Sequence, residues 1–327
     1  MIVRPFVLMF QAPQSFHHFI IIPAYRVNQP HQIEAILSVL HAILLGTIQG
    51  LSEFLPVSST AHLTIVGKAL GLIPADHPEA WTAFIAVIQL GTLSALLMYF
   101  ARDLWWMTSA FFRDVATHGG GKGFPGYSRD SFMVLYMVLG TLPVAIVGYA
   151  FENVIEGYLT KSMMFIGYSM VMLALFLWLA EAGAKHVRSL ADITWKDALV
   201  IGFAQVVALI PGASRSGTTI TAALFLGLRR GAAARFSFLL SIPVILGSGL
   251  LELYKLSALM KAGENVLHFG ILNLAVATLV SAVVGYAAIN WLLNYLVKYT
   301  TLPFVSYRIV LGSVLVALIA GGVISPR

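Results

Sequence analysis

Long apolar segments separated by polar connections repeat along most of this chain of 327 residues. A helix needs about 20 apolar residues to cross the hydrocarbon core of a membrane. Segments close to that length are residues 82–101, 131–150, 163–180, 235–254, 268–292 and 303–323. Their apolar and polar residues do not alternate, as they would in membrane-spanning β-strands. The pattern therefore predicts an all-α polytopic membrane protein with about six transmembrane helices.

Two further apolar stretches, residues 33–72 and 195–228, are each interrupted near the middle by proline and small polar residues. The interruptions read Leu55-Pro-Val-Ser-Ser-Thr60 and Pro211-Gly-Ala-Ser-Arg-Ser-Gly-Thr-Thr219. Proline disfavours an unbroken helix, because it lacks a backbone donor and its ring clashes with the preceding turn. Lipid cannot satisfy the backbone groups that such a break frees, so the break must be buried in protein or line a wet cavity. We therefore expect each stretch to form a re-entrant helix–loop–helix segment.

The basic residues indicate which connections share one side of the membrane. If each re-entrant segment enters and leaves on the same side, the connections that carry most of the Lys and Arg residues all lie on one side of the membrane. These connections are residues 102–130, 181–196, 229–234, with Arg235 at the boundary, and 293–302. Positive charge is concentrated in cytoplasmic loops, so this side is predicted to be cytoplasmic. The first re-entrant segment would then enter from outside and the second from the cytoplasm.

Four short sequence matches recur in the same order and support an inverted-topology repeat. They pair Gly46-Thr-Ile-Gln49 with Gly202-Phe-Ala-Gln205, Pro56 and Ser59 with Pro211 and Ser214, residues 147–150 with 284–287, and residues 165–168 with 304–307. The predicted halves are residues 34–180 and 195–323, which form a single membrane-embedded domain. Residues 1–33, which polar residues and prolines interrupt, are predicted to be an N-terminal extension outside the catalytic domain.

Composition restricts the remaining classes of function. Hydrophobic residues make up 59% of the chain and charged residues 10%, whereas soluble domains carry about 25% charged residues. The absence of cysteine rules out disulfides and thiolate metal sites. The net charge is +6, but no basic stripe with interleaved aromatic residues is present, so nucleic acid is not an expected partner.

The first interrupted segment carries ionisable and nucleophilic side chains. Gln49 and Glu53 are four residues apart and share one helix face. Hydroxyl groups follow at the break, on Ser58, Ser59 and Thr60. Ser59 and His62 would lie together on the first turn of the next helix. Ionisable groups at membrane depth are costly, which makes them candidates for function. The structural alternative is that Ser59 caps this helix with His62 as its capping-box partner.

The second interrupted segment has the features of an anion-binding site. A helix starting near Ser214 would direct free backbone N–H groups at an anion, and Arg215 adds a permanently charged fork suited to phosphate oxygens. Small and hydroxyl residues complete the segment, namely Ser216, Gly217 and Thr219. In the structural alternative, Arg215 pairs with a buried carboxylate, for which Glu53 is the expected partner. Arg308, at the start of the last predicted span, is expected to extend to the membrane interface.

Together the two segments supply what phosphoryl transfer requires: charge neutralisation, a nucleophile or oriented water, and a group that accepts a proton. Glu53 could also hold a divalent cation that bridges phosphate oxygens.

The two segments resemble the signature motifs of bacterial undecaprenyl-diphosphate phosphatases of the bacitracin-resistance type. The resemblance rests on Gln49-Gly-Leu-Ser-Glu-Phe-Leu-Pro-Val-Ser-Ser-Thr-Ala-His62, on Pro211–Thr219 and on Leu302-Pro-Phe-Val-Ser-Tyr-Arg308, and it covers about residues 34–323. It implies hydrolysis of undecaprenyl diphosphate to undecaprenyl phosphate and inorganic phosphate, which recycles the lipid carrier for cell-wall polymers and confers bacitracin resistance. It also implies a divalent cation (Mg²⁺ or Ca²⁺), a bacterial inner-membrane location and a homodimer.

By motif position, the resemblance implies that Glu53 is the essential carboxylate and that Ser59 and His62 are a catalytic pair. Arg215 would clamp the diphosphate, with Ser214, Ser216 and Thr219 beside it. Family members have Glu or Gln at the position of Gln49, so a metal held by two carboxylates of this motif is not expected here.

Two mechanisms and one rival function stay open from the sequence. Ser59 could attack phosphorus with Glu53 or His62 as its base, since a serine needs an adjacent base at neutral pH. Alternatively, His62 could attack or activate water while Ser59 orients the phosphate. The rival function is a lipid-phosphate flippase, because inverted repeats with broken helices also build secondary transporters.

Overall fold

The computed structural model describes residues 30–73, 78–118, 126–151, 162–261 and 270–325. The chain divides into two compact units, residues 1–37 and 38–327, and all contacts given below lie within the second. The extension predicted for residues 1–33 lies almost wholly outside the described residues. The described elements are α1 (Pro30–Phe54), α2 (Ser59–Ala69), α3 (Pro78–Tyr99), α4 (Ala101–His118), α5 (Arg129–Ala150), α8 (Met163–Gly183), a 3₁₀ turn (Leu190–Asp192), α9 (Trp195–Val207), α10 (Arg215–Phe225), α11 (Arg230–Lys261), α12 (Gly270–Lys298) and α13 (Leu302–Ala320).

Six described helices are long and apolar enough to cross a membrane, which confirms the six predicted spans. They are α3, α5, α8, α11, α12 and α13. Large apolar side chains are exposed along them, among them Leu279, Val283 and Val310. Such residues are costly in water but are the expected surface of a helix that faces lipid. The chain is thus an all-α, multi-pass membrane protein.

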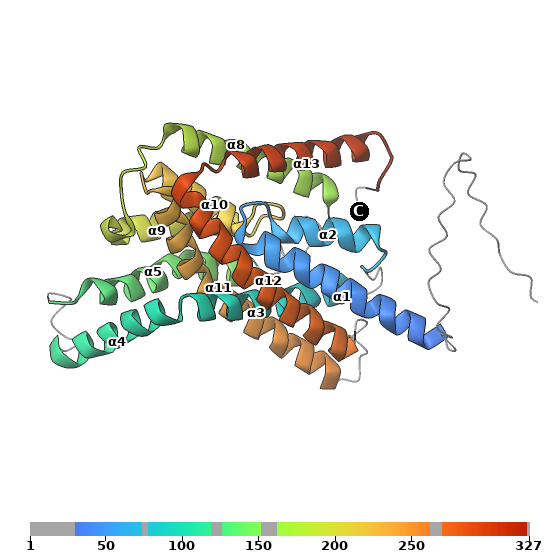
Figure 1. Ribbon diagram of the computed structural model, residues 1–327, viewed down its shortest axis with the longest axis horizontal. Helices are drawn as coiled ribbons and strands as arrows, with labels where there is room; N and C mark the ends of the chain where they lie inside the picture. The colour runs from blue at the N-terminus through green and yellow to red at the C-terminus, as the bar shows by residue number, and fades with distance from the viewer. Residues whose placement is uncertain (1–29, 74–77, 119–125, 152–161, 262–269, 326–327) are drawn as a thin grey trace, which may run out of the picture. The chain divides into compact units, whose positions relative to one another are not determined.

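Both interrupted stretches form pairs of helices, as predicted. The first break, residues 55–58, separates α1 from α2, and the second, residues 208–214, separates α9 from α10. Figure 1 shows α1 and α2 on one side of the breaks and α9 with α10 toward the opposite side. This arrangement fits two re-entrant segments that enter from opposite sides.

The packing of the helix pairs supports the inverted repeat. A Cβ atom added at Gly46 of α1 would lie 2.4 Å from the carbonyl oxygen of Ala277 in α12. A Cβ atom added at Gly202 of α9 would lie 2.4 Å from the carbonyl oxygen of Gly140 in α5. The two glycines are a matched pair in the sequence repeat, and their partners have the same spacing as the matched residues 147–150 and 284–287. Small residues let membrane helices approach closely, and here they do so at equivalent places in both halves.

The connection predicted for residues 102–130 is wrong in one respect, because most of it forms the helix α4. Trp105, Trp106 and Phe112 are exposed on this helix, and its polar residues interrupt the apolar pattern too often for a span. The end of α4 is tied to the start of α5, since Asp114 accepts hydrogen bonds from the Ser128 backbone (2.6 Å) and the Ser131 hydroxyl (2.5 Å). A search for long apolar runs overlooks an amphipathic helix of this kind.

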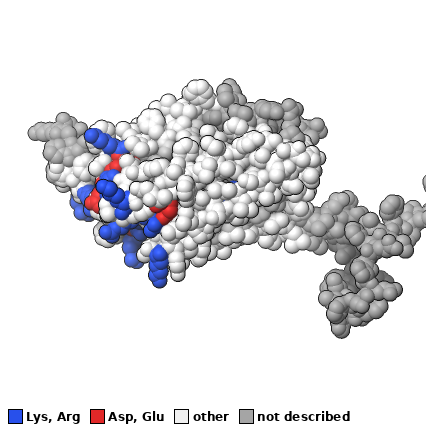
Figure 2. All heavy atoms as spheres, turned by 90° about the horizontal axis from the view of Figure 1, so that it is seen from above, with Lys and Arg blue, Asp and Glu red and all other residues white. Residues whose placement is uncertain are grey.

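Charged residues gather at one end of the face that Figure 2 shows, with Lys and Arg in excess over Asp and Glu. The sequence predicted that most basic residues lie in connections on one side of the membrane. Three acidic residues in or next to these connections form ion pairs. The ion pairs are Arg188 with Asp197, Arg230 with Glu181, and Arg235 with Asp103.

Candidate active site

Each break ends in a serine with an unusual backbone conformation. Ser58 has φ 77° and ψ 100°, and Ser214 has φ 70° and ψ 113°. The side chain of each serine caps the helix that follows, accepting from the backbone N–H of Ala61 (3.4 Å) or Gly217 (3.2 Å). A positive φ in a residue other than glycine costs on the order of 1–3 kcal/mol and persists where the surrounding structure enforces it, often at functional sites.

This geometry corrects the register of the predicted repeat. The sequence matches paired Ser59 with Ser214, but the structure gives the same capping role and the same conformation to Ser58 and Ser214. Ser59 therefore corresponds to Arg215, because each is the first residue of its helix. The predicted capping role of Ser59 is likewise filled by Ser58.

Replacing Ser58 separates the strain from the cap. In Ser58→Ala the helix loses its cap and the positive φ remains, so we expect the free energy of unfolding to fall by about 1–2 kcal/mol. Ser58→Gly also loses the cap, but glycine adopts positive φ without a steric penalty. The glycine variant should therefore have a higher thermal midpoint in detergent than the alanine variant. Equal midpoints would show that the conformation of Ser58 carries no strain.

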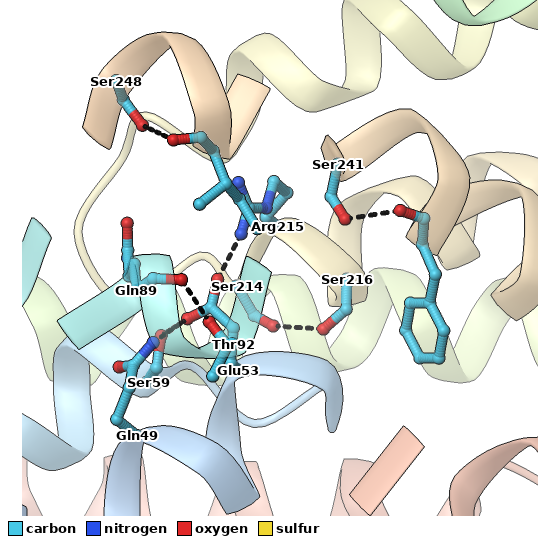
Figure 3. A network of polar contacts seen from close by, with 12 residues as sticks. Gln49, Glu53, Ser59, Gln89, Thr92, Ser214, Arg215, Ser216, Ser241 and Ser248 are labelled. Atoms are coloured by element: carbon cyan, nitrogen blue, oxygen red, sulfur yellow. Dashed lines mark hydrogen bonds and ion pairs between the residues drawn. The ribbon is translucent and has the colours of Figure 1, made fainter. Parts of the chain in front are cut away.

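Glu53 is the centre of the polar network between the breaks (Figure 3). One carboxylate oxygen accepts hydrogen bonds from Gln49 Nε2 (2.8 Å) and Ser59 Oγ (2.6 Å). The other oxygen forms an ion pair with Arg215. The carboxylate is buried, with 6% of the residue exposed. The structure thus brings together residues from α1, α2 and α10, and it confirms the expected pairing of Arg215 with Glu53.

Hydroxyl groups at the start of α10 connect this helix to its neighbours. Ser216 Oγ donates to the carbonyl oxygen of Leu55 (3.0 Å), which joins α10 directly to the first break. Ser216 also lies 3.2 Å from the hydroxyl of Ser214. Thr219 Oγ1 donates to the Arg215 carbonyl (2.8 Å) and lies 2.5 Å from the hydroxyl of Ser237 in α11. These contacts hold the start of α10, and so Arg215, against the first break.

The prediction that Arg308 extends to the membrane interface is wrong. Its residue is fully buried, and its guanidinium donates to the carbonyl oxygens of Pro56 (3.3 Å), Gly212 (3.1 Å) and Met170 (3.2 Å). One side chain therefore joins both breaks to α8. A Cβ atom at Gly217 would lie 2.7 Å from Arg308 Nη1, so the small residue at this position makes room for the arginine.

His62 does not lie against Ser59 in the way that its sequence spacing suggested. Its Nδ1 is 2.7 Å from the Ser58 carbonyl oxygen, and its Nε2 is 2.6 Å from the hydroxyl of Tyr307 in α13. The hydroxyl of Ser59 donates to Glu53 instead. Sequence reasoning missed Tyr307 as a site residue, although it belongs both to a repeat match and to the tail motif.

The first residues of α2 and α10 form an environment suited to an anion. The first backbone N–H groups of a helix have no partner within that helix, and the helix dipole places partial positive charge there. In α2 these residues are Ser59 and Thr60, and in α10 they are Arg215 and Ser216. A phosphate group between the two helix starts would meet N–H groups, hydroxyls and a guanidinium.

The region around Glu53 has the oxygen atoms that a divalent cation requires, but few of them. No group of three His, Cys, Asp or Glu side chains that could hold a metal occurs among the described residues. Gln49 Oε1 is buried and has no hydrogen-bond partner in the same part of the chain. Mg²⁺ is often held by one or two carboxylates together with substrate phosphates and water. A cation on Glu53 and Gln49 is therefore compatible with the side chains present, provided that phosphate completes its shell.

Polar residues of α3 and α11, which sequence reasoning did not assign, also border the network. Figure 3 shows Gln89 and Thr92 of α3 and Ser241 and Ser248 of α11 around Glu53 and Arg215. Several of these hydroxyls are bonded within their own helix: Thr92 donates to the Gln89 carbonyl (2.8 Å) and Ser241 to the Phe238 carbonyl (2.7 Å). Such local bonds satisfy a hydroxyl inside a membrane helix.

Comparisons with known proteins identify the family of this chain. Residues 42–314 match the family described as bacitracin resistance protein BacA. A protein of Syntrophobacter fumaroxidans named undecaprenyl-diphosphatase is 51% identical over 279 residues, which cover 85% of this chain and 96% of that protein. One of the same name from Chlorobium luteolum is 46% identical over 297 residues, covering 89% of this chain and all of that protein. This chain is therefore a member of the bacitracin resistance protein BacA family.

Proposed function

We propose that this protein hydrolyses undecaprenyl diphosphate to undecaprenyl phosphate and inorganic phosphate, and thereby recycles a lipid carrier of cell-wall synthesis and confers bacitracin resistance. The observation that carries the proposal is the contact of the Ser59 hydroxyl and Arg215, at the starts of α2 and α10, with the buried carboxylate of Glu53. The names of the relatives supply the substrate.

In the proposed reaction, Ser59 Oγ attacks the terminal phosphorus and its proton passes to Glu53, which already accepts the hydrogen bond from Ser59 (2.6 Å). The bond between this phosphorus and the bridging oxygen breaks, and undecaprenyl phosphate leaves. Glu53 gives its proton to the departing phosphate and is a base again when water attacks the phosphoserine. It takes a proton from this water and returns it to Ser59 Oγ as the bond between that oxygen and phosphorus breaks, which releases inorganic phosphate. Arg215 and the helix N–H groups stabilise the charge on the transferred group.

The geometry favours Ser59 with Glu53 as its base over the histidine alternative. Both ring nitrogens of His62 are engaged, one by the Ser58 carbonyl and one by Tyr307. A base must lie within hydrogen-bond reach of the proton that it accepts, and for the Ser59 hydroxyl this acceptor is Glu53. We assign supporting contacts with the phosphates to residues in and beside the two breaks. They are Gln49, Ser58 and Thr60 at the first break and Ser214, Ser216, Gly217 and Thr219 at the second.

Under this proposal Glu53 and Gln49 would hold a divalent cation, Mg²⁺ or Ca²⁺, together with the diphosphate. When bound, it would neutralise phosphate oxygens. We also propose that the protein works in the bacterial inner membrane and as a homodimer.

Phosphate release from farnesyl diphosphate or a longer polyprenyl diphosphate by purified protein in detergent tests the function. We expect release that a chelator suppresses and Mg²⁺ or Ca²⁺ restores. Reconstituted vesicles with labelled lipid test the rival function in parallel. If the protein flips lipid but releases no phosphate, its function is that of a flippase and not of a phosphatase.

Ser59→Ala is expected to lower kcat at least about 10²-fold, because it removes the proposed nucleophile. Ser52→Ala is the matched control, since its buried hydroxyl donates to the carbonyl of Ile48 in the same helix (2.5 Å) and should not affect turnover. Phosphate release and trapping of a phosphoserine measure the difference. Near-full turnover in Ser59→Ala, together with a loss in His62→Ala, would reverse the roles of the two residues.

A further inference from the structure

Tyr307 makes a contact that no part of the proposed reaction uses. Its hydroxyl lies 2.6 Å from His62 Nε2, and the two rings are stacked with centroids 5.5 Å apart and an interplanar angle of 8°. The other ring nitrogen of His62 is 2.7 Å from the carbonyl oxygen of Ser58. Tyr307, His62 and Ser58 therefore form a continuous chain from α13 to the strained residue that precedes Ser59.

The chemistry of the partners fixes the direction of these hydrogen bonds in neutral His62. A carbonyl oxygen only accepts, so Nδ1 must carry the proton and donate it to Ser58. Nε2 then holds the lone pair and accepts from the Tyr307 hydroxyl. Without the Tyr307 hydroxyl, the lone pair on Nε2 would lose this donor. The alternative tautomer, with its proton on Nε2, could not donate to the Ser58 carbonyl. The Ser58 carbonyl thus sets the tautomer, and the Tyr307 hydroxyl supplies the donor that Nε2 needs in this tautomer.

α13 holds the first break at two points through adjacent residues. Arg308 donates directly to the Pro56 carbonyl (3.3 Å), and Tyr307 reaches the Ser58 carbonyl through His62. The second contact bears on Ser59, because the orientation of Ser58 sets where α2 begins and where the Ser59 hydroxyl points. Reactive groups must be held close to their productive geometry by the residues around them.

The other half of the repeat lacks this chain, although it has a similar tyrosine. Tyr168 of α8 matches Tyr307, and it is 54% exposed; the structure shows no hydrogen bond to its hydroxyl within the described residues. The position that corresponds to His62 is Thr218, whose hydroxyl donates to Arg215 O (3.0 Å). The tyrosine–histidine chain is therefore present only at the break that carries Ser59, which argues against a general role in holding such breaks.

We propose that Tyr307 is a positioning residue of the hydrolytic site, which acts through His62 to hold Ser58 and thereby the Ser59 hydroxyl. This inference rests on the proposed function.

The test is a double-mutant cycle with Tyr307→Phe, which keeps the ring and removes the hydroxyl. We expect this variant to lower kcat about tenfold, the effect of losing one hydrogen bond, with little change in KM. In a His62→Gln background the same substitution should have no further effect on the residual rate, because its route to the site is already gone. Tyr168→Phe is the matched control and should behave as wild type.

Nitrogen NMR of protein labelled at histidine gives a second measurement that does not depend on turnover. The wild type should show one histidine in the neutral Nδ1–H tautomer whose signal is absent in His62→Gln and changes in Tyr307→Phe but not in Tyr168→Phe. An equal loss of kcat in both backgrounds, an unchanged kcat, or an unchanged histidine signal would each overturn the inference. If wild type releases no phosphate, the proposed function fails instead, and the NMR result still decides whether the Tyr307 hydroxyl donates to His62.

Discussion

Glu53→Gln is expected to reduce phosphate release about 10³-fold, which is within the range for loss of a general base. Glutamine has nearly the same shape, but it cannot take the Ser59 proton. It also leaves the partly buried Arg215 without the carboxylate that pairs with it. Initial rates of phosphate release from a polyprenyl diphosphate, measured at saturating substrate in detergent, give the change in kcat.

Glu181→Gln is the matched control for this substitution. Glu181 is also a buried carboxylate paired with an arginine, Arg230, and it accepts hydrogen bonds from the backbone and hydroxyl of Thr301 (3.2 and 2.7 Å). These contacts join α8, α11 and α13 and include none of the proposed reactive groups. We expect Glu181→Gln to lower the thermal midpoint and to preserve kcat per folded molecule. If both variants lost kcat equally, Glu53 would be no more than a structural ion-pair partner.

Arg308→Met is expected to cause the largest loss of stability, about 3 kcal/mol or more in the free energy of unfolding. Each buried carbonyl left without a donor costs about 1–3 kcal/mol, and this substitution removes the donor from Pro56, Gly212 and Met170. Methionine fills much of the volume, so the change reports mainly on the lost hydrogen bonds. Thermal unfolding in detergent is the measurement.

Arg102→Met provides the comparison on an exposed residue of α4 and should leave the free energy of unfolding within a few tenths of a kcal/mol of wild type. Arg308→Met should also lose turnover, because the two breaks would no longer be joined through α13. A variant as stable as wild type would mean that water replaces the guanidinium at the three carbonyls.

The spans and the breaks could be predicted from the sequence because their signals are local. A run of apolar residues long enough to cross a membrane has few other solutions, and proline followed by several small polar residues disfavours a continuous helix. The pairing of Arg215 with Glu53 was also accessible, since two opposite charges at membrane depth strongly favour each other. These local rules identified α1, α2, α9 and α10 together with most of the candidate site.

What sequence reasoning missed depends on contacts between distant parts of the chain. No neighbour of Arg308 in the sequence indicates that its guanidinium donates to carbonyl oxygens of the two breaks instead of extending to the membrane interface. Helical spacing suggested that His62 would serve Ser59, whereas the ring is oriented by Tyr307, far away in the sequence. The repeat register was one residue off because proline is the most visible feature of both breaks, while the backbone conformation is shared by Ser58 and Ser214.

The equivalence of Ser59 and Arg215 has a consequence for how such a site can arise. Each of the two residues is the first of its helix, so their backbone positions are equivalent and only their side chains differ. Two identical halves would place either two serines or two arginines at the centre. Neither arrangement offers a hydroxyl and a positive charge to one phosphorus atom at the same time. The repeated backbone can support phosphatase chemistry only because the side chains of its two halves have diverged.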